Sequence, residues 1–302
     1  MQLILHENVP MVVAYQNIFI QAYRNDLFTG HIQDVTRGIE GTWTLRKIHR
    51  IDEVLGGTVP IAIDAAPDNF NLFNESNTFA SSILSELWPS LYLLDPLRSP
   101  HPYLAKEMLT ETHSDNPSVP KDRTRFTIDI IRNATWNDGT PVTAEDVVYT
   151  FKYLYESGAK SNPGVAELTN LVSVYAPSTY RVIFEFETES YWHFSKFAYT
   201  YIIPKLIFDN VVGYEGWDSW DSLFYNDTIN VGAGPFKYTP DDVIPDDSYI
   251  LSVNPDFCYY PEVRLLAQEY FLNSNSIIQF SEIGVVSIFL VGFTYMKKRE
   301  SI

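Results

Sequence analysis

Residues 126–154 read FTIDIIRNATWNDGTPVTAEDVVYTFKYL, and this stretch carries the clearest structural pattern in the chain. Apolar and polar residues alternate from Phe126 to Ile130, which predicts a strand with one buried face. The pair Asp138-Gly139 then predicts a tight turn, because glycine adopts the positive φ that such turns require.

A helix is predicted directly after this turn. Thr143 is a suitable N-cap, and the Asp146 side chain, three residues later, can return a hydrogen bond to the cap. Apolar side chains then recur at helical spacing and predict one buried stripe, made of Val147, Val148, Phe151, Leu154 and Tyr155. The unit is therefore a strand, a turn and a capped helix.

The order of these residues resembles the signature of the family 5 extracellular solute-binding proteins, the oligopeptide, dipeptide and nickel receptors of ABC importers. Ile131-Arg132 stands at the family's Leu-Arg, and the runs DGTP at 138–141 and TAEDV at 143–147 match in place. The resemblance implies a mixed α/β (α+β) fold of the periplasmic-binding-protein type II kind. It also implies a peptide or similar small solute as ligand, an ABC transporter permease as partner, and no enzymatic activity.

The resemblance extends over most of residues 1–257, but in permuted order. Residues 1–50 resemble the C-terminal part of the family, residues 57–260 resemble its N-terminal lobe, and most of the second lobe is lacking. We expect essentially one lobe, in which a buried strand at residues 11–20 packs with residues 57–257. The alternative is a fragment of a tandem protein or a mispredicted reading frame.

Further elements are expected along the lobe-like segment. Alternation and apolar runs predict strands at residues 58–63, 180–186 and 250–254. A helix is expected at residues 79–94, with four leucine and isoleucine side chains on one face, and the resemblance implies another within residues 191–201.

The resemblance also implies where a solute would bind. The loop near residue 70, the glycine-rich turn at residues 232–236 and a tyrosine near the hinge would contribute to the cleft. The implied ligand-binding residues are Tyr23, Asn69, Phe70, Asn71, Gly232, Gly234, Pro235 and Phe236. For the turn, a purely structural role is the alternative, because glycines also permit close backbone packing.

Composition excludes several classes of function. The 302 residues carry a net charge of −17, which disfavours nucleic acid as a partner. The single cysteine, Cys258, excludes an internal disulfide and a cysteine-based metal cluster. The six histidines are scattered, the acidic clusters are typical of solvated loops, and no catalytic motif is present. We expect no catalytic residues, no metal site and no cofactor.

The C-terminal region contains an apolar run followed by Lys297, Lys298 and Arg299. We expect residues 277–296 to form an apolar helix that anchors the chain in the membrane, with the basic end cytoplasmic. The alternative is a core helix or a pair of strands. The first residues lack the basic region of a signal peptide, so the expected extracytoplasmic location rests on the resemblance.

Two functional hypotheses follow from the sequence. The first is the solute-binding component of an ABC-type importer, or a truncated form of one. The second is a membrane-anchored one-lobe surface module for protein interaction, without transport function. Saturable binding of a small solute would favour the first hypothesis, and self-association or capture of a partner protein would favour the second.

Overall fold

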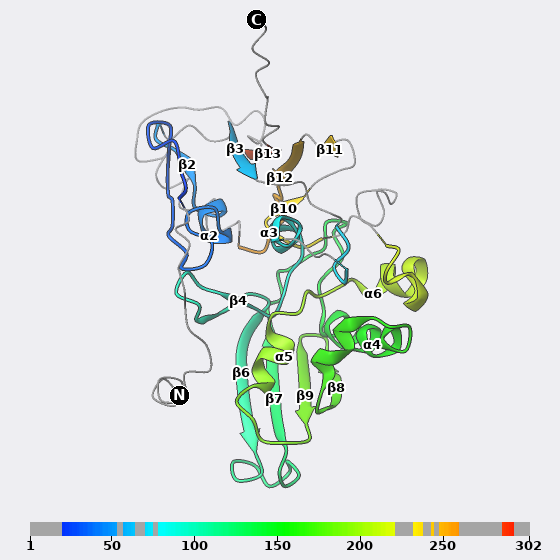
Figure 1. Ribbon diagram of the computed structural model, residues 1–302. Coiled ribbons are helices and arrows are strands. Elements are labelled where there is room, and N and C mark those ends of the chain that lie inside the picture. Colours follow the sequence, from blue (N-terminus) through cyan, green and yellow to red (C-terminus); the bar gives the residue numbers. More distant parts are fainter. Residues whose placement is uncertain are drawn as a thin grey trace, which may run out of the picture.

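The computed structural model describes residues 20–52, 57–63, 70–74, 78–220, 232–237, 243–244, 248–259 and 286–292. The expected strand at residues 11–20 therefore lies outside the described residues, except for Ile20, which is exposed and irregular. Two sheets organise the described chain, with helix α3 and several loops between them (Figure 1).

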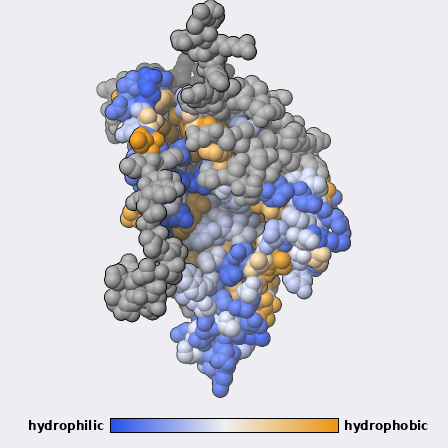
Figure 2. Space-filling model, in the orientation of Figure 1, coloured by the Kyte–Doolittle hydropathy of each residue, from blue (hydrophilic) through white to orange (hydrophobic). Residues whose placement is uncertain are grey.

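The lower sheet in Figure 1 is antiparallel and has the strand order β6-β7-β9-β8. Its strands are β6 (Ala105–Thr112), β7 (Thr124–Ile130), β8 (Leu171–Ser178) and β9 (Arg181–Phe186). The inward side chains Phe126, Ile128 and Ile130 of β7 are buried, as the alternation predicted. The tip of this sheet, at the bottom of Figure 2, is hydrophilic.

The upper sheet has five strands in the order β10-β12-β13-β3, with β11 paired to β12. Its bounds are β3 (Gly57–Ile63), β10 (Phe236–Lys237), β11 (Val243–Ile244), β12 (Ser248–Val253) and β13 (Val286–Gly292). Strand β13 runs parallel to β3 and antiparallel to β12. The strands expected near residues 58–63, 180–186 and 250–254 are confirmed within two residues at each end.

The expectation of an apolar helix at residues 277–296 is wrong over Val286–Gly292, which form strand β13. An uninterrupted apolar run suits a strand buried within a sheet as well as it suits a helix, so periodicity cannot separate the two. The other residues of that range lie outside the described residues. Among the helices that the structure describes, none combines the length and the apolar character that a membrane span requires.

Helix α4 (Ala144–Gly158) begins as predicted. The backbone N–H and the hydroxyl of Thr143 donate to Asp146 Oδ2 at 2.9 and 3.0 Å. The buried surface of α4 is wider than the predicted stripe, because Tyr153, which lies outside that stripe, is also buried. Its hydroxyl donates to Gly213 O at 2.8 Å. Tyr155 is 68% exposed, so its assignment to the buried stripe is wrong.

Helix α3 (Thr78–Leu87) is shorter than the expected helix at 79–94. Pro89 lacks the N–H that would continue the helical hydrogen bonds, and β4 (Tyr92–Leu94) follows and pairs with β5 (Pro100–Pro102). The four predicted apolar side chains are all buried even so, as Ile83, Leu84, Leu87 and Leu91.

The remaining elements are short. They are β1 (Phe28–Thr29), α2 (Thr42–Leu45), β2 (His49–Arg50), η1 (Pro163–Leu168), α5 (His193–Ala198), α6 (Lys205–Ile207), η2 (Phe208–Val212) and η3 (Tyr214–Gly216). Strand β1 pairs with β2, and α5 lies within the aromatic region expected to contain a helix.

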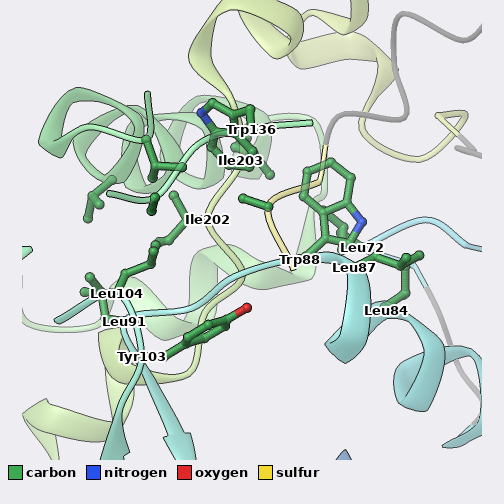
Figure 3. Packing of buried hydrophobic residues seen from close by; sticks show 14 of the residues in the cluster. Leu72, Leu84, Leu87, Trp88, Leu91, Tyr103, Leu104, Trp136, Ile202 and Ile203 are labelled. Carbon is green, nitrogen blue, oxygen red and sulfur yellow. The ribbon is translucent and has the colours of Figure 1, made fainter. Parts of the chain in front are cut away.

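The buried hydrophobic residues form one cluster that contains many aromatic side chains, among them Trp88, Tyr103 and Trp136 (Figure 3). The ring of Trp88 lies 5.7 Å from that of Trp220 and 6.4 Å from that of Trp136, in edge-to-face arrangements. Such pairs add about 0.5–1.5 kcal/mol to the stability gained from burial. Many of the aromatic residues therefore serve to pack the core.

Candidate functional site

The glycine-rich turn at residues 232–236 is buried and lies against the end of α3. The N–H groups of Ala233 and Gly234 both donate to Leu87 O, at 3.1 and 2.9 Å. A Cβ atom on Gly234 would lie 2.2 Å from Glu86 O, so only glycine permits this approach. The turn is thus fixed to α3 through its backbone.

Two asparagines brace the turn from other parts of the chain. Asn254 Nδ2 donates to Gly234 O at 2.9 Å and to Asn137 Oδ1 at 3.1 Å. The Asn137 N–H donates to Gly232 O, and the Asn254 N–H donates to Pro235 O, each at 2.8 Å. The predicted turn therefore joins the central motif to the end of β12. The sequence indicated the turn but not these two asparagines, whose contacts depend on tertiary structure.

Phe70 and Asn71, predicted near the cleft, are each only 2% exposed. The Phe70 ring lies 5.6 Å from the ring of Tyr249 in an edge-to-face arrangement. Asn71 Nδ2 donates to Trp217 O at 2.8 Å, which ties the loop to the region after α4. Asn69 lies outside the described residues.

Tyr23 is the most exposed of the described candidate residues, at 54%. Its ring lies 4.4 Å from the His31 ring, within its own segment of the chain. The structure thus brings residues 232–236 together, and it buries Phe70 and Asn71 against other residues. Whether any of them contacts a solute stays a prediction.

A pocket of about 270 Å³ opens where α4 begins, and sequence reasoning did not anticipate it. It lies between the central motif and the segment containing α6, and its lining includes Trp136, Pro141 and Pro204. Asp138, Glu145 and Asp209 also line the pocket, so most of its charged side chains are acidic. Lys205 Nζ lies 3.1 Å from Glu145 Oε2 and offsets part of this charge.

Asp146 is one of the residues that line this pocket, and it serves a structural purpose. Its Oδ1 atom accepts a hydrogen bond from the Lys205 N–H at 3.0 Å, and its Oδ2 atom caps α4. Burial raises the pKa of the Asp146 carboxyl, and the hydrogen bonds from Lys205 and Thr143 oppose that shift. The Thr143 hydroxyl and the Asp146 carboxylate, which both line this pocket, thus form part of the helix cap.

Among the described residues, no group of three or more His, Cys, Asp or Glu side chains is placed to hold a metal ion. Asp221, Asp241, Asp242, Asp246 and Asp247, which belong to the two acidic clusters of the sequence, lie outside the described residues.

Residues 99–276 match the family model for bacterial extracellular solute-binding proteins, family 5 Middle. A Brucella ovis protein named for ABC-transporter peptide binding is 24% identical over 187 residues, which is 60% of this chain and 32% of that protein. A Brucella melitensis protein named as a binding protein is 24% identical over 251 residues, or 78% of this chain and 38% of that protein.

Solved structures share the fold at low sequence identity. The oligopeptide-binding protein AppA from Bacillus subtilis, in complex with a nonapeptide, aligns with a TM-score of 0.56 and 18% identity, over 78% of this chain and 40% of that one. NikZ from Campylobacter jejuni, in complex with Ni(L-His), aligns with a TM-score of 0.55 and 14% identity, over 80% and 40%. This chain thus spans 32–38% of the curated relatives' length and 40% of these structures.

Proposed function

This chain belongs to the bacterial extracellular solute-binding proteins of family 5, and on that premise we propose that it contributes one lobe to the peptide-binding component of an ABC-type importer. The family consists of substrate-binding proteins of transporters rather than enzymes, which agrees with the absence of a catalytic motif from the sequence. The proposed location is extracytoplasmic, and the proposed partner is the permease of the importer.

The observation that carries the proposal is the family match over residues 99–276. The preference for peptides comes from the relatives, because the name of the Brucella ovis protein specifies peptide binding and AppA was solved with a nonapeptide. Nickel-histidine is the competing ligand class, since it occupies NikZ. The fold alone does not separate these ligands, because one fold carries many binding specificities.

We also propose that residues 1–50 complete the lobe formed by residues 57–260. The described contacts between the two segments support this division. Trp43 Nε1 donates to Leu94 O at 2.9 Å, and the Val35 N–H donates to Pro96 O at 3.1 Å. A segment similar to the end of the family would then pack against the segment similar to its beginning, within one chain.

The proposed solute face combines a rigid support with more exposed groups. The turn at residues 232–236 would shape this face through its backbone, since its hydrogen bonds are directed at α3 and Asn254. Tyr23, which is half exposed, would offer an aromatic surface to the solute. Solute sites generally combine a preformed frame with a few polar and aromatic contacts.

A thermal-shift screen of the full chain tests the proposal. The ligands are pools of peptides two to nine residues long, nickel-histidine and an oligosaccharide control. A ligand at a hundredfold its Kd stabilises a protein by about 2.7 kcal/mol, which for this length raises Tm by roughly 5–10 °C. We expect this shift with peptides. A cooperative melt that no peptide pool shifts, or a shift with nickel-histidine alone, would contradict the proposal.

A further inference from the structure

Residues 32–46, here called the docked segment, lie across α3 and β4. Besides the hydrogen bonds to Leu94 and Pro96, Arg37 Nη1 donates to the Ser82 hydroxyl on α3. The Trp43 ring also contacts His101 edge-on, with centroids 5.0 Å apart. Several polar contacts therefore hold the docked segment, in addition to the packing of Leu45 against the core, and polar contacts respond to charge more strongly than apolar packing does.

Glu86 of α3 lies at the centre of this interface and is completely buried. One carboxyl oxygen, Oε1, accepts a hydrogen bond from the Thr42 hydroxyl. The other, Oε2, has no hydrogen-bond partner, and the nearest cation is Arg46, whose Nε lies 3.9 Å away. A buried carboxylate requires close compensation on both oxygens, and here only one oxygen has it.

Arg46 does not provide the missing hydrogen bond. Its guanidinium carbon lies 5.0 Å from the ring centroid of Tyr103, 5.7 Å from that of Phe257 and 6.0 Å from that of Trp43. Aromatic faces hold a cation favourably, but Nε and Nη2 of Arg46 remain without hydrogen-bond partners. The Tyr103 hydroxyl is also buried and unpartnered, and Figure 3 shows it pointing toward the side of α3.

The charge state of Glu86 is decided by the groups around it. Burial raises the pKa of the Glu86 carboxyl, while Arg46, the Thr42 hydroxyl and Arg37 act in the opposite direction. The Tyr103 hydroxyl, whose own pKa burial raises, faces the same cluster from the chain before β6. Cys258 and Tyr259 adjoin Tyr103 from the segment after β12. Complete burial therefore favours the neutral form of Glu86, while the two arginines favour its ionised form.

The backbone of the same residue supports the glycine-rich turn. Gly234 approaches Glu86 O so closely that a Cβ atom there would lie 2.2 Å from it. The side chain of Glu86 thus contacts the docked segment, and its carbonyl contacts the turn predicted to shape the solute face. A change at Glu86 would reach both surfaces.

We propose that Glu86 is a protonation-controlled latch, which holds residues 32–46 against α3 when its carboxyl is neutral and loosens them when it ionises. This inference goes beyond solute binding and does not depend on which solute the protein takes. A neutral carboxyl carries its own proton donor and avoids the cost of burying an imperfectly paired charge. When the carboxyl is ionised, separation of residues 32–46 from α3 lets water reach the carboxylate and stabilise its charge.

The direction of the pH effect follows from the raised pKa of Glu86. A group whose pKa is higher when docked contributes stability that is complete below its undocked pKa, about 4.3 for glutamate. That contribution is lost as pH rises through the docked pKa. Docking should therefore be strongest in mild acid and weaken toward alkaline pH.

Hydrogen exchange of the full chain, followed by mass spectrometry from pH 4.5 to 8, tests the latch. Protection factors are corrected for the intrinsic pH dependence of exchange, and strand β7 serves as internal reference, because the pKa of its Asp129 carboxyl is lowered and lies below this range. We expect the protection of residues 32–46 to fall relative to β7, by up to about tenfold for each pH unit between the undocked pKa, about 4.3, and the docked pKa, and to level off above the docked pKa. Protection that stays level relative to β7 across this range would overturn the proposal.

Three variants make the test specific. Glu86→Gln keeps the side chain neutral and should make protection of the docked segment independent of pH. Thr42→Val removes a donor to the carboxylate, so the pH midpoint should rise; this variant decides the question if Glu86→Gln does not fold. Glu145→Gln alters an exposed carboxylate and should behave as wild type. A wild-type pH profile in Glu86→Gln or an unmoved midpoint in Thr42→Val would refute the latch.

Discussion

Gly234 shows how one residue can position a whole turn. Its N–H donates to Leu87 O at 2.9 Å, its own carbonyl accepts from Asn254 Nδ2 at 2.9 Å, and there is no space for a side chain. Sequence alone could identify a Gly-Pro turn, because glycine and proline mark turns locally. It could not identify α3 as the surface beneath, since that contact joins residues far apart in the chain.

Gly234→Ala should destabilise the protein by about 2–3 kcal/mol, because the new methyl group would collide with backbone rather than with a movable side chain. Gly41→Ala is the matched control: its Cβ would meet its nearest neighbours at 3.5 Å, and it should cost no more than about 1 kcal/mol. Urea unfolding of both variants, followed by circular dichroism, measures the difference. Equal losses would show that the close approach at residue 234 does not matter.

At the scale of elements, β7 and α4 were predictable because their signals are local. Alternation defines the strand, and Thr143 with Asp146 defines the start of the helix. The predictions failed where tertiary contacts decide. Tyr153 lies on a second buried side of α4, which a prediction based on one apolar stripe does not include. The apolar run at Val286–Gly292 forms a strand between β3 and β12 in a sheet. The pocket beside α4 likewise requires the α6 segment, which arrives from elsewhere in the chain.

Asp146→Ala should destabilise the protein by about 2–4 kcal/mol, because it removes the cap of α4 and leaves the Thr143 and Lys205 N–H groups without their acceptor. The neighbouring change Glu145→Ala removes an exposed ion pair with Lys205 and should cost less than about 1 kcal/mol. Shifts in the urea midpoint compare the two. If both variants unfold at the same midpoint, the capping interaction is not a principal support of α4.

At the scale of the molecule, residues 20–52 and the segments from residue 57 onward meet around α3 and β4. The buried turn at residues 232–236 contacts the backbone of α3 at that meeting point. Arg46 of the other segment lies there beside the side chain of Glu86 on α3. The permuted order of the two segments stays a prediction, which rests on the local resemblance of each segment to a part of the family. How they contact each other could not be predicted from the sequence, because the polar contacts of Trp43, Arg37 and Thr42 follow no sequence pattern.

The central proposal is that this member of family 5 binds peptides, and native mass spectrometry of the full chain with defined peptide pools tests it most directly. The account predicts a complex of one chain with one peptide. Its occupancy should saturate with peptide concentration and fall when an unlabelled competitor peptide is added, while nickel-histidine and an oligosaccharide at equal concentration leave no comparable complex. Peptide adducts that grow without saturation, or a saturable complex formed with nickel-histidine but not with peptides, would contradict it.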